Sequence, residues 1–432
     1  MKKKLVSIIV CAAISVVSLA GCGSAASAAN EKGNSSENAG TETKAEDAVS
    51  NLIAATKTPV ELTLWCSETQ EYQSVMAELV DEFKKKYPEV DFNITIGSES
   101  EAECKNDVLS DVEEAADVFI FPDDQLPDLV EAGALQKIEA TYTYDPKQTN
   151  APQIVEAASE NGDLYAYPLT ASNGYFLFYD KTKLSEEDVK SWDSLLEAAE
   201  KQGKTVGMEV SGAWFLYGFF AGAGLDMKAG DDGKNICNWN ATDTKYKGSD
   251  VASAITEICK NPAMKNCVNE DAQSFALNGQ MIADVNGAWA INAFKKAYGD
   301  GYAAAKLPTF TVNGEQVQMG SFAGYKFVGV NAYSKNPGWA MLLSEFITDK
   351  TSQEKISLAT GEAPANTEAA ESSEISSEPA LEALAEQAKY SSLQRVGDNY
   401  WEPAASLGQS LVEGKYSDVQ KLLDDAVAGI TQ

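Results

Sequence analysis

Histidine is absent from this chain of 432 residues, and arginine occurs once, at Arg395. Without histidine, the chain has no imidazole base, no serine–histidine catalytic triad and no histidine-ligated zinc site. Sites that clamp phosphate or carboxylate ligands in a bidentate way usually use several arginines, because the guanidinium fork matches a planar anion. These two absences favour an uncharged ligand over an anionic one.

Phosphate-binding glycine loops and calcium-binding loops are also missing, and no pair of cysteines has the CxxC spacing. We therefore expect no cofactor and no bound metal. The formal net charge of -31 argues against binding to nucleic acid and against direct electrostatic attachment to anionic lipid.

Five of the seven cysteines lie beyond the first 22 residues, namely Cys66, Cys104, Cys237, Cys259 and Cys267. An odd number cannot pair completely within one chain. Cys259 and Cys267 are close enough in sequence to form a disulfide, but all five are equally compatible with small apolar packing positions.

The first 22 residues have the pattern of a lipoprotein signal peptide. Three lysines, Lys2 to Lys4, precede an apolar stretch that ends in Leu19-Ala20-Gly21-Cys22, which resembles the bacterial lipobox. The pattern predicts that Cys22 becomes the acylated (palmitate-type) N-terminus and holds the protein at the extracytoplasmic face of the cell membrane. An ordinary signal peptide cut nearby, or an N-terminal membrane helix, is the alternative.

Residues 23–57 contain almost no large apolar side chain before Leu52, so we expect a disordered tether there. The remaining length predicts two domains rather than one. Alternating apolar residues at 60–64 and 90–96 flank an amphipathic helix at 75–86, which is the strand–helix–strand unit of a parallel sheet. The predicted fold class is α/β.

Three polar or glycine-flanked segments interrupt the pattern where the chain could cross between domains. The first, Thr170 to Gly174, separates an extended stretch ending at Pro168 from a continuous apolar strand, 175–179. The others lie at 320–324 and 363–378. These crossings predict one lobe made of 58–170 with 325–370, and another made of 171–324 with 371–432. Polar groups at such crossings line the floor of any cleft between the lobes.

Carboxylates are plentiful, with 65 Asp and Glu residues, so an acid–base pair for glycoside hydrolysis could be drawn from them, although solvated surface is the default for each. A more specific pattern is an aromatic residue beside polar side chains, just after a strand or at a helix start. A sugar ring stacks its C–H face on an aromatic plane, and its hydroxyls need acceptors and donors. Any one aromatic is more often a core residue, and we expect Trp65, at a strand end, to be one. The pattern occurs at Trp65, Phe121, Trp214, Trp289 and Tyr400-Trp401.

Several short stretches, in this order, resemble the maltose-binding proteins, the carbohydrate-binding subunits of bacterial ABC importers. The resemblance runs from about Pro59 to Gln432 and implies a two-lobed periplasmic-binding-protein-like fold with discontinuous lobes joined by a multi-segment hinge. The stretches are Leu62-Thr-Leu-Trp65, Ala116-Asp-Val-Phe-Ile-Phe121, Glu131-Ala-Gly-Ala-Leu-Gln136, Tyr165-Ala-Tyr-Pro168, Phe178-Tyr-Asp-Lys181, Asn286-Gly-Ala-Trp289, Lys306-Leu-Pro308 and Phe327-Val-Gly-Val330.

The resemblance also implies the binding residues. It places aromatic platforms at Phe121 (a tryptophan in the better-known relative), Trp214, Trp289, and Tyr400 or Trp401. It places polar contacts at Gln70, Asp124, Gln125, and Ser172 or Asn173. Glutamine stands for a lysine at 70 and for an arginine at 125, and Ser172 or Asn173 stands for a glutamate, so the hydroxyl partners differ from those of the family.

The patterns and the resemblance together predict a lipid-anchored substrate-binding protein for a neutral oligosaccharide, first of all a maltooligosaccharide. The resemblance implies that it is a monomer and that it delivers the sugar to ABC importer membrane subunits. We expect no catalysis, because no constellation of catalytic residues stands out in the sequence, and the importer's ATPase would be another chain. A secreted glycan hydrolase that uses an Asp/Glu pair is the alternative, and a surface adhesin or structural lipoprotein is a third.

Overall fold

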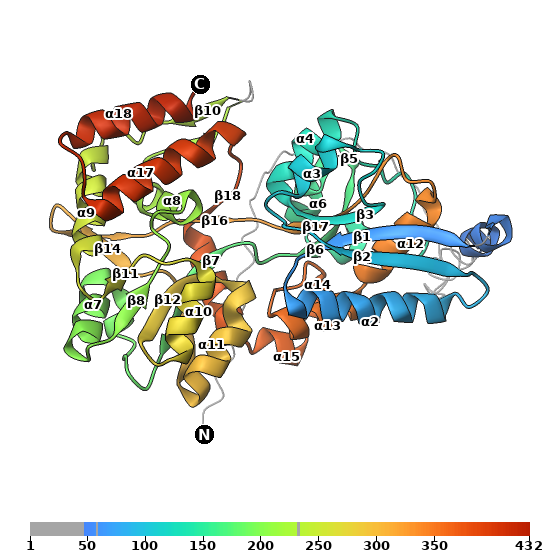
Figure 1. Ribbon diagram of the computed structural model, residues 1–432, viewed down its shortest axis with the longest axis horizontal. Helices are drawn as coiled ribbons and strands as arrows, with labels where there is room; N and C mark the ends of the chain where they lie inside the picture. The colour runs from blue at the N-terminus through green and yellow to red at the C-terminus, as the bar shows by residue number, and fades with distance from the viewer. Residues whose placement is uncertain (1–46, 58, 231–233) are drawn as a thin grey trace, which may run out of the picture. The chain divides into compact units, whose positions relative to one another are not determined.

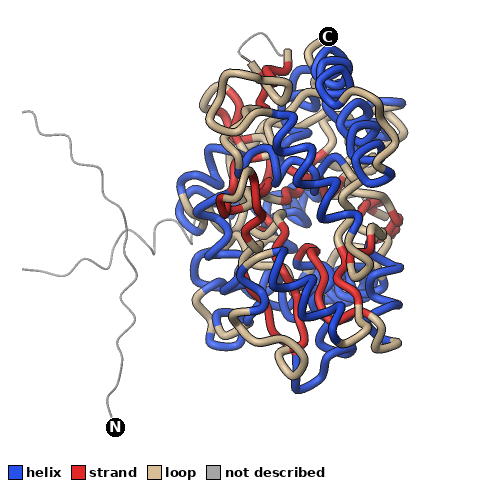
Figure 2. The backbone as a smooth tube through the Cα atoms, turned by 90° about the vertical axis from the view of Figure 1, so that its left-hand side faces the viewer, coloured by secondary structure: helices blue, strands red, loops and turns tan. Residues whose placement is uncertain are grey.

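The computed structural model describes residues 47–57, 59–230 and 234–432. Two five-stranded sheets form its framework, and Figure 2 shows helices on both sides of the strands. The first sheet runs in the order β2 (Phe92–Ser98), β1 (Val60–Cys66), β3 (Val118–Pro122), β17 (Lys326–Val330) and β6 (Ala166–Thr170). β1 pairs in parallel with β2 and β3, whereas β17 is antiparallel to β3 and β6.

The first sheet is covered on both faces by amphipathic helices. One core holds the alternating apolar residues of β1 and the apolar stripe of α2 (Gln70–Lys86), which runs beside β2 in Figure 1. α12 (Pro337–Ile347) packs on the same core, and α13 (Lys350–Thr360) lies against α2. The other face carries α3 (Cys104–Ser110), α4 (Leu126–Glu131) and α6 (Pro152–Ala157).

The second sheet runs in the order β11 (Met264–Lys265), β8 (Thr205–Gly207), β12 (Met281–Gly287), β7 (Tyr175–Asp180) and β13 (Tyr302–Ala305). The sequence of β7 is continuously apolar because both faces of the strand are buried. Tyr175, Leu177 and Tyr179 pack into one core, and Phe176 and Phe178 pack into another. The first of these cores holds α7 (Trp192–Lys201), α8 (Ala213–Gly222), α9 (Gly248–Lys260), α17 (Trp401–Glu413) and α18 (Val419–Ile430). The second holds α10 (Asn269–Leu277), α11 (Ile291–Tyr298) and α16 (Pro379–Gln387).

The chain passes between the two sheets at the polar and glycine-flanked segments, as Figure 1 shows for the passages from β6 to β7 and from β16 (Ser321–Ala323) to β17. The crossing segments are bonded to one another. Asn173 donates its backbone N–H to the Gly324 carbonyl (3.2 Å), and Ala171 donates to Ala363 (2.8 Å). The predicted α/β class is therefore confirmed, while the exact lobe boundaries stay a prediction.

The prediction of a disordered tether over 23–57 is wrong at its C-terminal end, because residues 47–55 are helical. Val49, Leu52 and Ile53 give this segment an apolar side that packs on the core beside α12. Trp339 of α12 donates its indole N–H to Thr56 Oγ1 at 2.7 Å. The signal peptide, Cys22 and the rest of the predicted tether, up to residue 46, lie outside the described residues.

The third crossing segment, 363–378, contains two short helices, α14 (Thr367–Ala370) and α15 (Ser373–Ser376), which bury Ala369 and Ile375. Cys259 and Cys267 do not form a disulfide, and the five cysteines beyond the leader are free thiols. Among the described residues, no helix has the length and hydrophobicity needed to cross a membrane.

Candidate ligand-binding cleft

A cavity of about 890 Å³ opens between loops of the first sheet and helix ends of the second. On one side, the segments at the ends of β1, β2 and β3 line it with residues 67–70, residues 100–103 with Lys105, and Pro122, Asp124 and Gln125. These segments lie together because the carboxyl ends of parallel strands meet at one edge of a sheet. The other side carries the starts of α8, α10 and α17.

The second side of the cavity presents indole rings, here called the aromatic wall: Trp214, Trp289 and Trp401. The Trp214 and Trp289 rings have centroids 5.5 Å apart and planes inclined by 41°. Trp289 lies in η3 (Ala288–Ala290), directly after the central strand β12. A Cβ on Gly287 would lie 2.2 Å from the Trp289 ring, so only glycine allows this indole to fold back over the strand end.

Two predicted platforms are not in the cavity. The Phe121 ring is fully buried, with the Phe119 and Phe327 rings 5.7 and 6.1 Å away, because β3 is covered on both faces. Tyr400 is also fully buried and donates its hydroxyl to the Ala213 carbonyl at 2.7 Å. The structure therefore corrects the prediction at both positions, and of the pair Tyr400 and Trp401 only Trp401 lines the cavity.

The predicted polar contacts divide in the same way. Gln70, Asp124, Gln125 and Asn173 line the cavity, whereas Ser172 is buried outside it and accepts a hydrogen bond from the Ala363 N–H. Gln125 lines the cavity but its amide holds the loop before α3. It donates to the carbonyls of Glu101 and Ala102 and accepts from the Lys105 N–H, at 2.9 to 3.1 Å.

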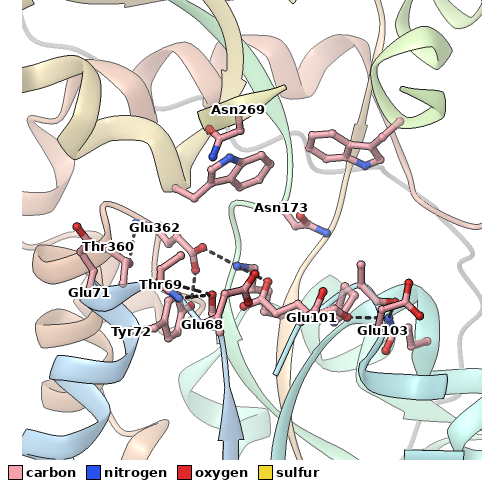
Figure 3. A pocket seen from close by; sticks show the side chains of 18 of the residues that line it. Glu68, Thr69, Glu71, Tyr72, Glu101, Glu103, Asn173, Asn269, Thr360 and Glu362 are labelled. Carbon is pink, nitrogen blue, oxygen red and sulfur yellow. Dashed lines mark hydrogen bonds and ion pairs between the residues drawn. The ribbon is translucent and has the colours of Figure 1, made fainter. Parts of the chain in front are cut away.

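Carboxylates gather on the first side of the cavity, here called the acidic wall: Glu68, Glu71, Glu101, Glu103, Asp124 and Glu362. Figure 3 shows Glu68, Glu101, Glu103 and Glu362 on this side, with Asn269 opposite and Asn173 between the two sides. Carboxylate oxygens are strong hydrogen-bond acceptors, so this wall suits a ligand that presents hydrogen-bond donors.

A buried ion cluster underlies the acidic wall. Lys326 Nζ lies 2.7 Å from Glu101 Oε2 and 2.6 Å from Glu362 Oε1, and Tyr72 donates its hydroxyl to Glu362 Oε2. Burial alone would lower the pKa of Lys326, but the charges of Glu101 and Glu362 outweigh it and raise that pKa. Our sequence reasoning missed this cluster, although a lysine opening the apolar strand 326–330 was a visible signal.

Residues just after β18 (Ser391–Leu393) connect the two sides of the cavity. Gln394 accepts a hydrogen bond from Trp214 Nε1 (2.6 Å) and donates to Asp124 Oδ2 (2.9 Å). Arg395, the only arginine of the chain, contacts the fully buried Asp123 through its carboxylate (2.9 Å) and its carbonyl (2.8 Å). The sequence did not single out Gln394, because its partners lie 180 and 270 residues away.

Burial, together with the charge of the adjacent Asp123, raises the pKa of Asp124 to about 6, and the hydrogen bond from Gln394 opposes this rise. Within the described part of the chain, no three histidine, cysteine or acidic side chains are grouped so that they could hold a metal ion. The cavity thus presents the indole rings of the aromatic wall on one side and the hydrogen-bond acceptors of the acidic wall on the other.

Two α/β lobes with a polar and aromatic cavity between them define a ligand-binding protein of the periplasmic-binding-protein class. Residues 78–383 match the family model described as bacterial extracellular solute-binding protein, and the chain belongs to that family.

Among curated relatives, the chain is 25% identical to the galactooligosaccharide-binding protein of Bacillus subtilis (strain 168) over 389 residues, which cover 85% of this chain and 87% of that protein. It is 24% identical to the maltooligosaccharide ABC transporter solute-binding lipoprotein of Streptococcus pneumoniae (strain ATCC BAA-255 / R6) over 335 residues, which cover 73% and 76%.

Solved structures agree on the fold. The maltodextrin-binding protein MalE1 from L. casei BL23, without ligand, has a TM-score of 0.72 and 28% identity, and the match covers 87% of this chain and all of that one. The Thermus thermophilus maltotriose-binding protein, with 21% identity and coverage of 86% and 99%, has a TM-score of 0.73. The predicted two-lobed fold and the resemblance to maltose-binding proteins are confirmed.

Proposed function

We propose that this protein is the substrate-binding lipoprotein of an ABC importer and that it binds a neutral oligosaccharide in the cleft. The observation that carries the proposal is the pairing of Trp214 and Trp289 across from the acidic wall. The names of the relatives, which bind galactooligosaccharides, maltooligosaccharides and maltodextrins, support the same ligand class.

The two walls suit the two kinds of surface on a sugar. The C–H face of a pyranose stacks on an indole, and the hydroxyls on its rim donate to carboxylates. A wall of six carboxylates, with only Lys105 and Lys326 as bases lining the cavity, repels an anionic saccharide. This charge distribution therefore favours an uncharged saccharide over an anionic one.

Maltooligosaccharides are the first choice of ligand, and galactooligosaccharides are the second. Both ligand classes appear among the relatives, at nearly equal identity. Binding would stabilise a closed arrangement of the lobes in proportion to the ligand's greater affinity for it. We propose that six side chains contact the sugar directly: Gln70, Asp124, Asn173, Trp214, Trp289 and Trp401.

Attachment through an acylated Cys22 would keep the protein at the outer face of the membrane, next to the importer subunits. We propose a monomer that carries the sugar without altering it. A relative that is named as a lipoprotein supports the anchor.

Incubation of the purified protein with maltotriose, maltotetraose and galactotriose tests the proposal. Calorimetry should show saturable binding of at least one of them, and chromatography of the same mixtures should show unchanged chain lengths. Shortened products would establish a hydrolase instead. Absence of binding to every member of the panel would contradict oligosaccharide transport.

A further inference from the structure

The side chain of Gln394 forms hydrogen bonds with residues of both walls of the cleft. Gln394 follows β18 and precedes η6 (Asp398–Tyr400), is 6% exposed and lines the cavity. Its backbone N–H donates to the carbonyl of Ala323, which belongs to the second crossing segment. This bond fixes the backbone of Gln394 at the edge of the cavity.

The orientation of its amide follows from its partners. The indole N–H of Trp214 can only donate, so the amide oxygen must face it, at 2.6 Å. The amide NH₂ then faces Asp124 and donates to Oδ2 at 2.9 Å. A single planar group thus joins a ring of the aromatic wall to a carboxylate of the acidic wall.

We infer that Gln394 is a positioning residue for the sugar site, which sets the Trp214 ring and the Asp124 carboxylate in the arrangement that receives the ligand. This inference rests on the proposed function for the identity of the ligand, but the arrangement it describes exists without one.

The arrangement leaves one acceptor open. Asp124 Oδ1 is buried and has no hydrogen-bond partner, whereas Oδ2 is occupied by Gln394. A buried acceptor without a partner is unfavourable, and a ligand hydroxyl that donates to it removes that penalty. Gln394 therefore determines which oxygen of Asp124 remains for the ligand.

Neighbouring contacts hold the same segment against the first side of the cavity. Arg395 pairs with the buried Asp123, and Asp398 pairs with Lys105 at 2.8 Å. Lys105 also contacts Asp128, so α3 and α4 share the contact. These ion pairs keep Gln394 in reach of Asp124.

The protonation of Asp124 gives a signal that a purely structural role would not produce. The charged groups that act on it are Asp123, which raises its pKa, and Arg395, which lowers it together with the Gln394 bond. Loss of that bond should move the pKa upward from about 6, so that the accepting carboxylate is lost at a higher pH.

The first test needs no sugar. In the wild-type protein, the indole N–H resonance of Trp214, assigned by its loss in Trp214→Phe, should titrate with a midpoint near 6 because Gln394 links the ring to Asp124. The titration should disappear in Asp124→Asn and in Gln394→Met, which keeps the length of the side chain. A wild-type resonance that does not titrate, or one that titrates unchanged in Gln394→Met, overturns the inference.

The second test uses maltotriose, or whichever saccharide of the panel binds most tightly. Gln394→Met should bind it about 3- to 10-fold more weakly at pH 7, and its affinity should fall at a higher pH than that of the wild type. Gln148→Met is the matched control, because Gln148 is exposed and lies outside the cavity, with its amide bonded to Asp145 in the same turn. It should leave the pH profile of binding unchanged.

The two tests separate the two claims. A wild type that shows the Trp214 titration but binds no saccharide contradicts the proposed function and supports the linkage. A wild type that binds a saccharide as tightly and with the same pH profile as Gln394→Met contradicts the inference and leaves the proposed function intact.

Discussion

The indole rings of Trp214 and Trp289 lie with their centroids 5.5 Å apart, although they come from different elements, the start of α8 and the short helix after β12. Both rings are only partly buried and both line the cavity. Each therefore keeps an accessible face while resting on the other. This arrangement separates them from the fully buried tryptophans Trp192 and Trp239.

Replacement of Trp289 by alanine should lower the affinity for the sugar by about 1–3 kcal/mol, which is the range for a lost aromatic contact. The melting temperature should change little, because the ring is not part of a closed core. Calorimetric titration and thermal unfolding measure the two effects. Trp192→Ala, a core replacement, should instead lower the melting temperature by many degrees.

Gly287→Ala should weaken sugar binding by displacing the Trp289 ring, since the new Cβ would lie 2.2 Å from it. The backbone at Gly287, with φ -97° and ψ 176°, is open to alanine, so backbone strain does not contribute. The expected loss is about 1 kcal/mol or more. In a Trp289→Ala background the same change should have no further effect on affinity, and a fully additive double-mutant cycle would contradict the mechanism.

Asp284 should make the folded state less stable as the pH rises. It is buried in the central strand β12, with Asn286 as its hydrogen-bond donor, and burial raises its pKa to about 8. In the unfolded chain the pKa is about 4, so the folded state binds the proton more tightly. The stabilisation is complete below about pH 4 and is lost as the pH rises through about 8.

Asp284→Asn should remove this dependence, because the amide stays neutral. Melting temperatures from pH 5 to pH 9 should therefore converge or cross for the two proteins, with the wild type losing more on the alkaline side. Parallel curves would show that Asp284 does not hold its proton in the folded state.

Lys326→Met should destabilise the protein by about 3–5 kcal/mol, since it leaves the buried Glu362 and the partly buried Glu101 without their cation. Replacing both carboxylates by glutamine as well should recover much of that loss. Denaturant unfolding measures the free energies. The control is Lys137→Met, whose pair with Asp163 is exposed to solvent and should contribute little to stability.

The sequence was informative where local pattern decides the structure. Alternation at 60–64 and the apolar run at 175–179 produced the strands β1 and β7, and the polar segment 171–174 is where the chain leaves the first sheet. Trp214 and Trp289 were found because each follows small polar residues at the start of a helix. Their position beside each other depends on two distant segments and could not be read from either.

The failures have physical causes. Phe121 ends a strand, as a platform would, but that strand is covered on both faces and the ring turns into the core. Ser172 and Gln125 have the right chemistry for a sugar, yet their hydrogen-bonding groups hold backbone of neighbouring loops. The lysine that opens the apolar strand 326–330 was visible in the sequence, but the partners of Lys326 and Gln394 lie far along the chain, and no short-range pattern identifies them.

Calorimetric titration of the wild type and of a Trp214→Ala/Trp289→Ala variant with maltotriose, maltotetraose and galactotriose tests the central claim most directly. We expect one saccharide to bind the wild type at a single saturable site and to lose at least about 2 kcal/mol of affinity in the folded double variant. Equal affinity for both proteins, with the variant's fold verified by its melting temperature, would contradict the placement of an oligosaccharide against the aromatic wall.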